Sequence, residues 1–286
     1  MSSELDRPAL HQAIPPVSAT AVVVDLRNFT PNLNAAGVDA SGVNVFCRFL
    51  GGLYGFCLDA ALMAMSREDR EDPPVYMGST GDGVIMVFLD PEWHYGHGYL
   101  ASLILQVTLG RMCRSYNLSS LHNTQVPHTG FGIGVESGKV CRVSAERNDG
   151  KVIVDTYIGD CINVASRAQG VSKHLHRADT IVCRRVNQLL CETLLGEDYD
   201  ALLALEPDAD DAECLESEHR LRDLNEELCL AFLHLHQLRG VDRPMTLFRV
   251  SERAAQPGNP RFEGLIEQLI RGDAEHLKQV MAIIRG

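Results

Sequence analysis

The stretch ATAVVVDL, residues 19–26, is a run of small and β-branched residues that ends in an acid followed by a leucine. This run predicts a central β-strand, because β-branched side chains pack well on a pleated sheet. An acid at the end of a strand, here Asp25, can present its carboxylate and the next carbonyl, that of Leu26, to a hard metal ion. Free N–H groups of the turn that follows can meet phosphate oxygens. The plainer alternative is that Asp25 only caps the next segment.

Outward from this strand, the chain mixes helical and strand patterns without strict alternation. Apolar periodicity and turn residues predict helices at 44–65, 98–116 and 160–171, strands within 75–89, at 128–135, 228–237 and 245–250, a short strand and helix within 180–195, and a helical tail at 262–285. This order is typical of an α+β fold. We expect three parts: a lead-in at 1–18, a main domain at 19–250 and a tail at 251–286.

The composition is that of an acidic globular protein. Of the 286 residues, 45% are hydrophobic and 22% charged, and the formal net charge is −12. That charge argues against nucleic-acid polymers, whose binding depends on Lys and Arg, although a small anion could bind through metal ions or a local cationic cluster. Nine cysteines without a Cys-x-x-Cys pair indicate neither a zinc site nor a disulfide framework. No apolar run approaches the roughly 18 residues of a membrane span, and the start lacks a signal-peptide core, so we expect a cytoplasmic protein without membrane insertion.

A second acid lies in a predicted hairpin turn. The sequence GDG, residues 81–83, separates the two strand-like halves of residues 75–89. Alone, Gly-Asp-Gly is a common turn in which the acid supplies only turn geometry. Together with Asp25, however, Asp82 would place two carboxylates at adjacent strand ends. Such a pair can bridge two divalent metal ions that hold a triphosphate and activate an attacking oxygen.

A third motif follows a glycine-rich strand. GFGIGVESGKV, residues 130–140, leads on to TYIGDCINVASR, residues 156–167. Within the predicted helix, Asn163 and Arg167 are four residues apart and therefore share one face. An amide and a guanidinium there could orient a ribose and neutralise charge on a transferring phosphorus. The alternative is that both belong to an ordinary exposed face.

In order and spacing, these three motifs resemble the catalytic domain of class III adenylate and guanylate cyclases over roughly residues 19–250. The resemblance implies a ferredoxin-like α+β fold with a mostly antiparallel sheet and flanking helices. It also implies a homodimer with shared active sites. One protomer would bind two Mg²⁺ or Mn²⁺ ions, and the other would supply the groups for the transition state. The implied metal ligands are Asp25, Leu26 and Asp82, and the implied catalytic residues are Asn163 and Arg167.

The resemblance implies further contacts with the nucleoside triphosphate. LRGVDRPMTLF, residues 238–248, looks like the closing segment of the family and puts Arg239 where a basic residue often contacts polyphosphate. The ribose 3′-hydroxyl would attack the α-phosphorus, pyrophosphate would leave, and Arg167 would stabilise the developing charge. The implied substrate-binding residues are Phe29, Thr30, Tyr76, Gly78, Thr156 and Arg239.

The base-reading position departs from the pattern of the family. Four residues before the second metal carboxylate, adenylate cyclases usually have Lys and guanylate cyclases Glu, whereas this chain has Gly78. The partner position is Thr156, as in many bacterial adenylate cyclases. Tyr76 lies on the same strand face as Gly78, so its ring could fill the space and favour a pyrimidine base; alternatively it only packs in the core. The pattern is also similar to the stand-alone uridylate and cytidylate cyclases of bacterial anti-phage (Pycsar) systems.

Three functions therefore stay open. The preferred hypothesis is a pyrimidine cyclase that uses UTP best and CTP next, and whose product a separate effector reads in anti-phage signalling. The alternatives are an adenylate or guanylate cyclase with an atypical base pocket and a catalytically silent nucleotide-binding regulator. The presence of both acids and of both helix residues argues against the silent regulator, because such a protein has no chemical need for all four.

Two other patterns give structural expectations. His94 and His97, beside Trp93, are interpreted as part of a surface loop, and the acidic stretch 197–222 as a solvated loop. We expect the helices of the tail to pack on the main domain or on its dimer mate.

Overall fold

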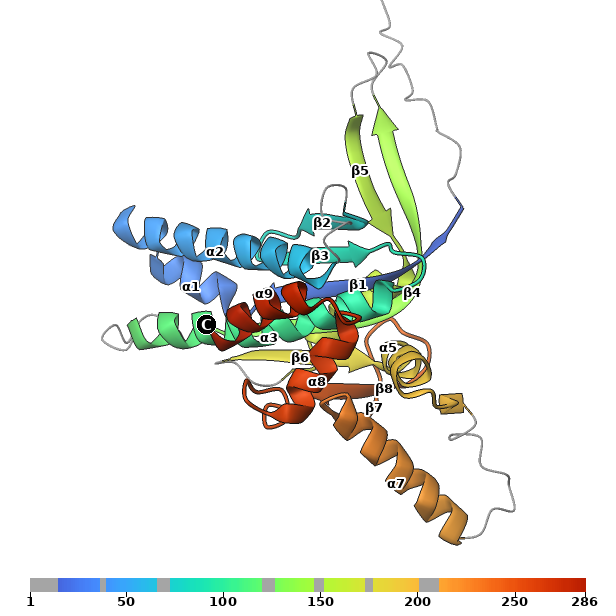
Figure 1. The fold of residues 1–286 in the computed structure, drawn as a ribbon. Helices are drawn as coiled ribbons and strands as arrows, with labels where there is room; N and C mark the ends of the chain where they lie inside the picture. The colour runs from blue at the N-terminus through green and yellow to red at the C-terminus, as the bar shows by residue number, and fades with distance from the viewer. Residues whose placement is uncertain are drawn as a thin grey trace, which may run out of the picture.

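The computed structural model describes residues 15–36, 40–65, 73–119, 127–146, 152–172, 177–200 and 211–286. An eight-stranded sheet has the order β2-β3-β1-β4-β6-β8-β7, with β5 paired to β4 outside this path (Figure 1). The strands are β1 (Val17–Leu26), β2 (Val75–Ser79), β3 (Gly83–Phe88), β4 (Phe131–Glu146), β5 (Val152–Ile158), β6 (Ala178–Cys183), β7 (Leu230–His236) and β8 (Met245–Val250). Among the described strands, only β4 and β6 are parallel neighbours, and the other pairs are antiparallel. This mostly antiparallel α+β architecture confirms the expected fold class.

Helices cover both faces of the sheet. They are α1 (Phe29–Ala36), α2 (Ala40–Ala64), α3 (His94–Ser119), α4 (Asp160–Gln169), α5 (Arg184–Leu190), the π-helical turn η2 (Cys191–Leu195), α7 (Asp211–Glu227), α8 (Pro260–Leu269) and α9 (Ala274–Arg285). The long helices α2 and α3 form a large core with one face of the sheet, to which α8 and α9 also contribute. On the opposite face, α4 packs over β1 and β4 in a smaller core.

β1 lies inside the sheet and separates the two cores. Val22 and Val24 face the large core, whereas Ala21 and Val23 face the small core beneath α4, and none of the four is more than 4% exposed. Burial on both faces explains why the sequence of β1 is continuously apolar and does not alternate. Because β1 pairs with β3 on one side and β4 on the other, two hydrogen-bonded ladders fix its end at Asp25.

Glycines on β4 let α4 approach the sheet closely. A Cβ atom at Gly134 would overlap the carbonyl oxygen of Ala165, and one at Gly138 would lie 3.0 Å from the Cβ of Cys161. A side chain at Gly134 would therefore push the helix away from the strand. The glycine-rich sequence of β4 thus sets the position of α4.

The expectation of a surface loop at His94 and His97 is wrong. α3 begins at His94, and these two histidines are only 7% and 6% exposed. Asp90 caps the helix by accepting a hydrogen bond from the backbone N–H of Trp93, and the Nδ1 of His94 lies 2.7 Å from the Oγ1 of Thr20. The cap and this buried polar partner start the helix before its apolar periodicity begins.

The acidic stretch 197–222 is only partly a loop. From Asp211 onward it forms α7, which ends at Glu227, while residues 201–210 lie outside the described residues. Its Glu, Leu and Arg residues are good helix formers, and burial of Leu224 anchors the helix. The two tail helices, α8 and α9, pack against α3, in agreement with the expectation that they pack on the main domain.

One window of α2, Cys47–Ala64, has the length and apolar composition of a membrane span, which was not expected from the sequence. Of this window 28% is buried, and α2 packs against α3. A core helix satisfies the same criteria of length and composition as a membrane span. The absence of membrane insertion therefore stays a prediction.

Candidate active site

Asp25 and Asp82 lie beside each other where β1 ends and the β2–β3 turn closes. The antiparallel register pairs Asp25 with Gly83, and the N–H of Leu26 donates to the carbonyl oxygen of Asp82 at 3.1 Å. Burial raises the pKa of Asp25, and the nearby charge of Asp82 raises it further. Because each negative charge is unfavourable to the other, a cation bound between these carboxylates would be stabilised.

Two glycines at the β2–β3 turn and a tyrosine of α2 shape this turn. Gly81 has a φ of +94°, which residues with a side chain rarely adopt, and a Cβ atom at Gly83 would overlap the backbone of β1. The hydroxyl of Tyr54 donates to the carbonyl oxygen of Gly81 at 2.8 Å and lies 2.8 Å from the Oγ of Ser79. Tyr54 thus supports the turn that carries Asp82, although no local pattern in the sequence predicts this role.

The donor set suits a hard divalent cation. The carboxylates of Asp25 and Asp82 and the carbonyl of Leu26 are oxygen ligands, which Mg²⁺ and Mn²⁺ prefer. Within the described residues, no group of three or more His, Cys, Asp or Glu side chains could hold a metal ion. Mg²⁺ is commonly bound by one or two carboxylates together with substrate phosphates. Two carboxylates therefore fit a metal ion that is completed by a nucleotide.

Two residues outside the predicted set connect Asp25 to α4. The Nε2 of Gln169, at the end of α4, donates to the Oδ2 of Asp25 at 3.4 Å, and Arg27 donates to the carbonyl oxygen of Gln169. Burial raises the pKa of Asp25, and the Arg27 guanidinium opposes part of this rise. A Cβ atom at Gly132 would overlap the guanidinium and crowd Gln169. Gly132 therefore leaves the space in which this bridge forms.

Asn163 and Arg167 lie on the exposed side of α4. Between them in sequence, Ala165 is fully buried and rests on Gly134 of β4. At about 100° per residue, both polar residues are roughly 160° around the helix from Ala165. The structure therefore places Asn163 and Arg167 on one face, as predicted, but turns that face away from the sheet and from Asp25 of the same chain.

Tyr76, Gly78 and Thr156 form one cluster. The hydroxyl of Tyr76 is 3.1 Å from the Oγ1 of Thr156 on β5, and the ring packs against Tyr157 with the centroids 5.4 Å apart. A Cβ atom at Gly78 would lie 2.7 Å from the Tyr76 hydroxyl and 3.2 Å from two ring carbons. The Tyr76 ring therefore covers the position from which a side chain at residue 78 would project.

The strand register places this cluster on the same face of the sheet as Asp25. Ile85 of β3 is opposite both Val23 of β1 and Gly78 of β2. Since side chains alternate between the two faces of a strand, Asp25, Tyr76 and Gly78 belong to the face that α4 covers in part. Strand spacing and residue rise put the Cα atoms of Asp25 and Gly78 roughly 12 Å apart.

The other predicted residues are less closely connected. Phe29 begins α1 and packs against the large core, and Thr30 is exposed in the first turn of the same helix. Arg239 is exposed in the connection between β7 and β8, and β4 and β6 separate β8 from β1. In the described part of the chain, no hydrogen bond or ion pair links Arg239 to another residue of the predicted site.

The arrangement of strands and helices is similar to that of solved nucleotide cyclases. The match to the adenylyl cyclase CyaB from P. aeruginosa covers 85% of this chain and 97% of that one, at 14% identity and a TM-score of 0.52. The guanylyl cyclase Cya2 matches over 84% of this chain and 94% of its own, at 13% identity and a TM-score of 0.52. A bacterial light-regulated adenylyl cyclase matches over 95% of this chain and 60% of its own, at 16% identity and a TM-score of 0.53.

At these identities, the likeness shows that the chain has the fold of nucleotide cyclases. No family model and no curated protein matches the chain.

Proposed function

We propose that the chain is a nucleotidyl cyclase that converts a nucleoside triphosphate into a 3′,5′-cyclic nucleotide and pyrophosphate. The observation that carries this proposal is the pair Asp25 and Asp82, held side by side at strand ends in a chain with the cyclase fold. The 3′-oxygen forms a bond to the α-phosphorus, the bond to the β-phosphate bridging oxygen breaks, and the hydroxyl proton is released. Pyrophosphate is the leaving group.

Asp25, Asp82 and the carbonyl of Leu26 would hold the metal ions of this site. Two Mg²⁺ or Mn²⁺ ions bound there supply neutralisation of the triphosphate charge and a lower pKa for the attacking hydroxyl. Gln169 and Arg27 keep the carboxylate of Asp25 in place from the side of α4. The oxygen-rich donor set and the raised pKa of Asp25, caused first by burial and then by Asp82, support this assignment.

The active enzyme is a homodimer with two shared sites in this proposal. Asn163 and Arg167 are exposed and lie on the far side of α4 from the sheet, so they are free to reach a nucleotide held by a second chain. There the amide orients the ribose, and the guanidinium stabilises charge on the phosphorus. Thr156 belongs to β5, which leads directly into α4. In this proposal, Thr156 and its neighbour Tyr76 therefore contact the base of the same nucleotide that Asn163 contacts.

The preferred substrate is UTP, with CTP next. The Tyr76 ring fills the space at Gly78, and its hydroxyl pairs with Thr156, so the pocket is shortened and lacks a long purine-reading side chain. Steric filling of a pocket discriminates by roughly 10- to 200-fold, so we expect a preference and not exclusion of purines. Similarity to stand-alone pyrimidine cyclases supports an anti-phage role in which a separate effector reads the product.

The second candidate is an adenylate or guanylate cyclase, which the names of the structural neighbours favour.

A four-way competition tests the substrate. The purified full chain is incubated with equal ATP, GTP, CTP and UTP and Mn²⁺, and the products are identified by mass spectrometry. Cyclic UMP is expected in excess, Asp82→Ala should form no product, and Asp223→Ala, a change of an exposed aspartate on α7, should be as active as the wild type. Cyclic AMP or cyclic GMP as the main product would support the second candidate. No turnover of any of the four would favour a silent regulator.

A further inference from the structure

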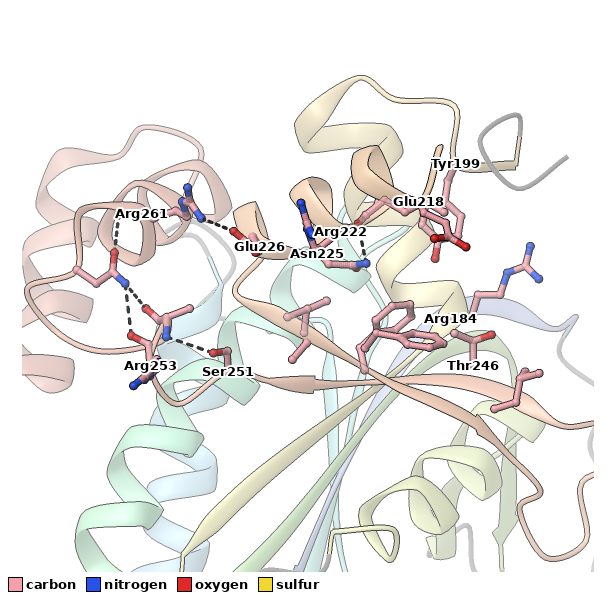
Figure 2. A pocket seen from close by; sticks show the side chains of 18 residues that line it. Arg184, Tyr199, Glu218, Arg222, Asn225, Glu226, Thr246, Ser251, Arg253 and Arg261 are labelled. Carbon is pink, nitrogen blue, oxygen red and sulfur yellow. Dashed lines mark hydrogen bonds and ion pairs between the residues drawn. The ribbon is translucent and has the colours of Figure 1, made fainter. Parts of the chain in front are cut away.

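A large apolar cavity lies far from the candidate active site. Its volume is about 960 Å³, and it lies between α7, the β7–β8 hairpin and the segment that leads from β8 into α8 (Figure 2). Because β4 and β6 separate β8 from β1, this cavity is roughly 15 Å or more from the strand that carries Asp25. Its size falls within the range of small-ligand sites, which is roughly 300–1,000 Å³.

The floor of the cavity is an apolar part of the sheet that is accessible to solvent. Phe232 and Leu235 of β7 line it and are 55% and 66% exposed, and the ring of Phe232 meets that of the buried Phe248 edge to face at 5.9 Å. β7 is the last strand of the sheet, where the helical layer only partly covers the apolar face. Removing the surface of a large apolar side chain from water is favourable, so an apolar ligand body would be stabilised here.

The rim of the cavity carries charges of both signs, in a chain whose net charge is −12. The charged residues that line it are Arg184, Arg222, Arg253, Arg261, Glu218 and Glu226. Three of the arginines have acidic partners: Arg184 pairs with Asp200, Arg261 with Glu226 and Glu227, and Arg222 lies 3.9 Å from the carboxylate of Asp223.

One rim arginine, Arg253, is available to a ligand. Within the described residues, Arg253 forms no ion pair. Figure 2 shows Arg253 at one end of the cavity, near Ser251, and Arg222 on α7, one helical turn after Glu218. An apolar floor with a free guanidinium group at its edge is complementary to an apolar molecule that ends in an anion.

We propose that this cavity binds an acyl carboxylate of the fatty-acid type. The acyl chain lies over Phe232 and Leu235, and the carboxylate meets Arg253. A nucleotide suits the cavity less well, because the donors and acceptors of its base would face a mostly apolar wall. This site and the proposed cyclase activity are independent, so either can fail without the other.

Fluorescence titration of the full chain with parinaric acid, a fluorescent fatty acid, tests the proposal. We expect saturable binding at one site per chain, competition by dodecanoate and much weaker competition by dodecanol. Phe232→Ala should weaken binding about 10- to 100-fold, from the lost apolar contact. Arg253→Ala should weaken it about 2- to 5-fold, as expected for an exposed ion pair. The matched controls on α3, Leu118→Ala and Arg114→Ala, should bind like the wild type, because both residues are exposed outside the cavity.

Three results would overturn the proposal. The first is the absence of saturable binding to the wild-type chain, and the second is equal binding by Phe232→Ala. The third is a loss of self-association by a Phe232→Asp variant in sedimentation, together with no probe binding by the wild-type chain; this result would assign the cavity to a second copy of the chain and reject the fatty acid.

Discussion

Replacement of Glu136 by Gln should change how the stability of the protein depends on pH. Glu136 lies on β4 and is 4% exposed. Its Oε1 accepts a hydrogen bond from the N–H of Ser137 at 2.9 Å, whereas its buried Oε2 has no partner among the described residues. Burial raises the pKa of Glu136 from 4.5 to about 7, and the side chain of Cys183, the N–H of Ser137 and the charge of Arg185 only partly oppose this rise.

The sign of the effect follows from proton binding. The folded chain holds the proton of Glu136 up to about pH 7, whereas the unfolded chain releases it near pH 4.5. This group therefore contributes its full stability below pH 4.5 and loses that contribution as the pH rises through 7. At about 1.4 kcal/mol for each pH unit between the two pKa values, the loss amounts to about 3 kcal/mol. The glutamine of the Glu136→Gln variant carries no charge, so this variant should not lose that stability as the pH rises.

Urea unfolding at several pH values measures this difference. The fluorescence of the single tryptophan, Trp93, reports unfolding, and the free energies of wild type and variant are compared between pH 4.5 and 8. The difference should grow toward pH 8 in favour of Glu136→Gln, and Glu267→Gln, a change of an exposed glutamate, should follow the wild type. Burial lowers the pKa of His94 to about 4. This shift makes the free energy of unfolding rise with pH, opposite to the effect of Glu136, but it is the same in all three proteins and cancels in the comparison. A difference between wild type and Glu136→Gln that is independent of pH would refute the reasoning.

Four further predictions concern the candidate site. Asp25→Ala and Asp82→Ala should each abolish cyclase turnover and leave the circular dichroism spectrum unchanged; near wild-type activity in either would reject the metal assignment. Mixing Asp25→Ala with Arg167→Ala chains should restore one working site per heterodimer, and no recovery despite demonstrated subunit exchange would contradict the shared site. Gly134→Ala should lower the free energy of unfolding by about 1–3 kcal/mol, because its methyl group overlaps α4; unchanged urea unfolding would show that the contact can relax. Tyr76→Ala should shift product ratios toward cyclic AMP and cyclic GMP more than it lowers total turnover, and an unchanged ratio would reject the pocket mechanism.

The parts of the site that are set by local sequence were predictable. A run of β-branched residues was enough to place Asp25 at a strand end. Turn residues were enough to place Asp82 in a hairpin turn, because strand pairing across a short turn is a local property. The shared face of Asn163 and Arg167 follows in the same way from helical periodicity. The proximity of Tyr76 to Gly78 also follows from alternation along one strand.

Features that depend on contacts between distant segments were not predictable. Gln169 meets Asp25 across 144 positions of sequence, and the Tyr54 hydroxyl reaches the turn at Gly81 from another element. No pattern within a window of residues encodes such contacts. His94 was misassigned for the same reason, since its burial depends on Thr20, which lies 74 positions earlier on β1.

The two faces of α4 belong to different parts of the proposed dimer. The inner face is fixed by Ala165 on Gly134, and its last residue, Gln169, bonds to Asp25 of the same chain. The outer face carries Asn163 and Arg167, which in the shared-site arrangement act on the nucleotide bound by the other chain. In that arrangement α4 connects the Asp25 side of one active site, through Gln169, with the outer residues that belong to the other active site.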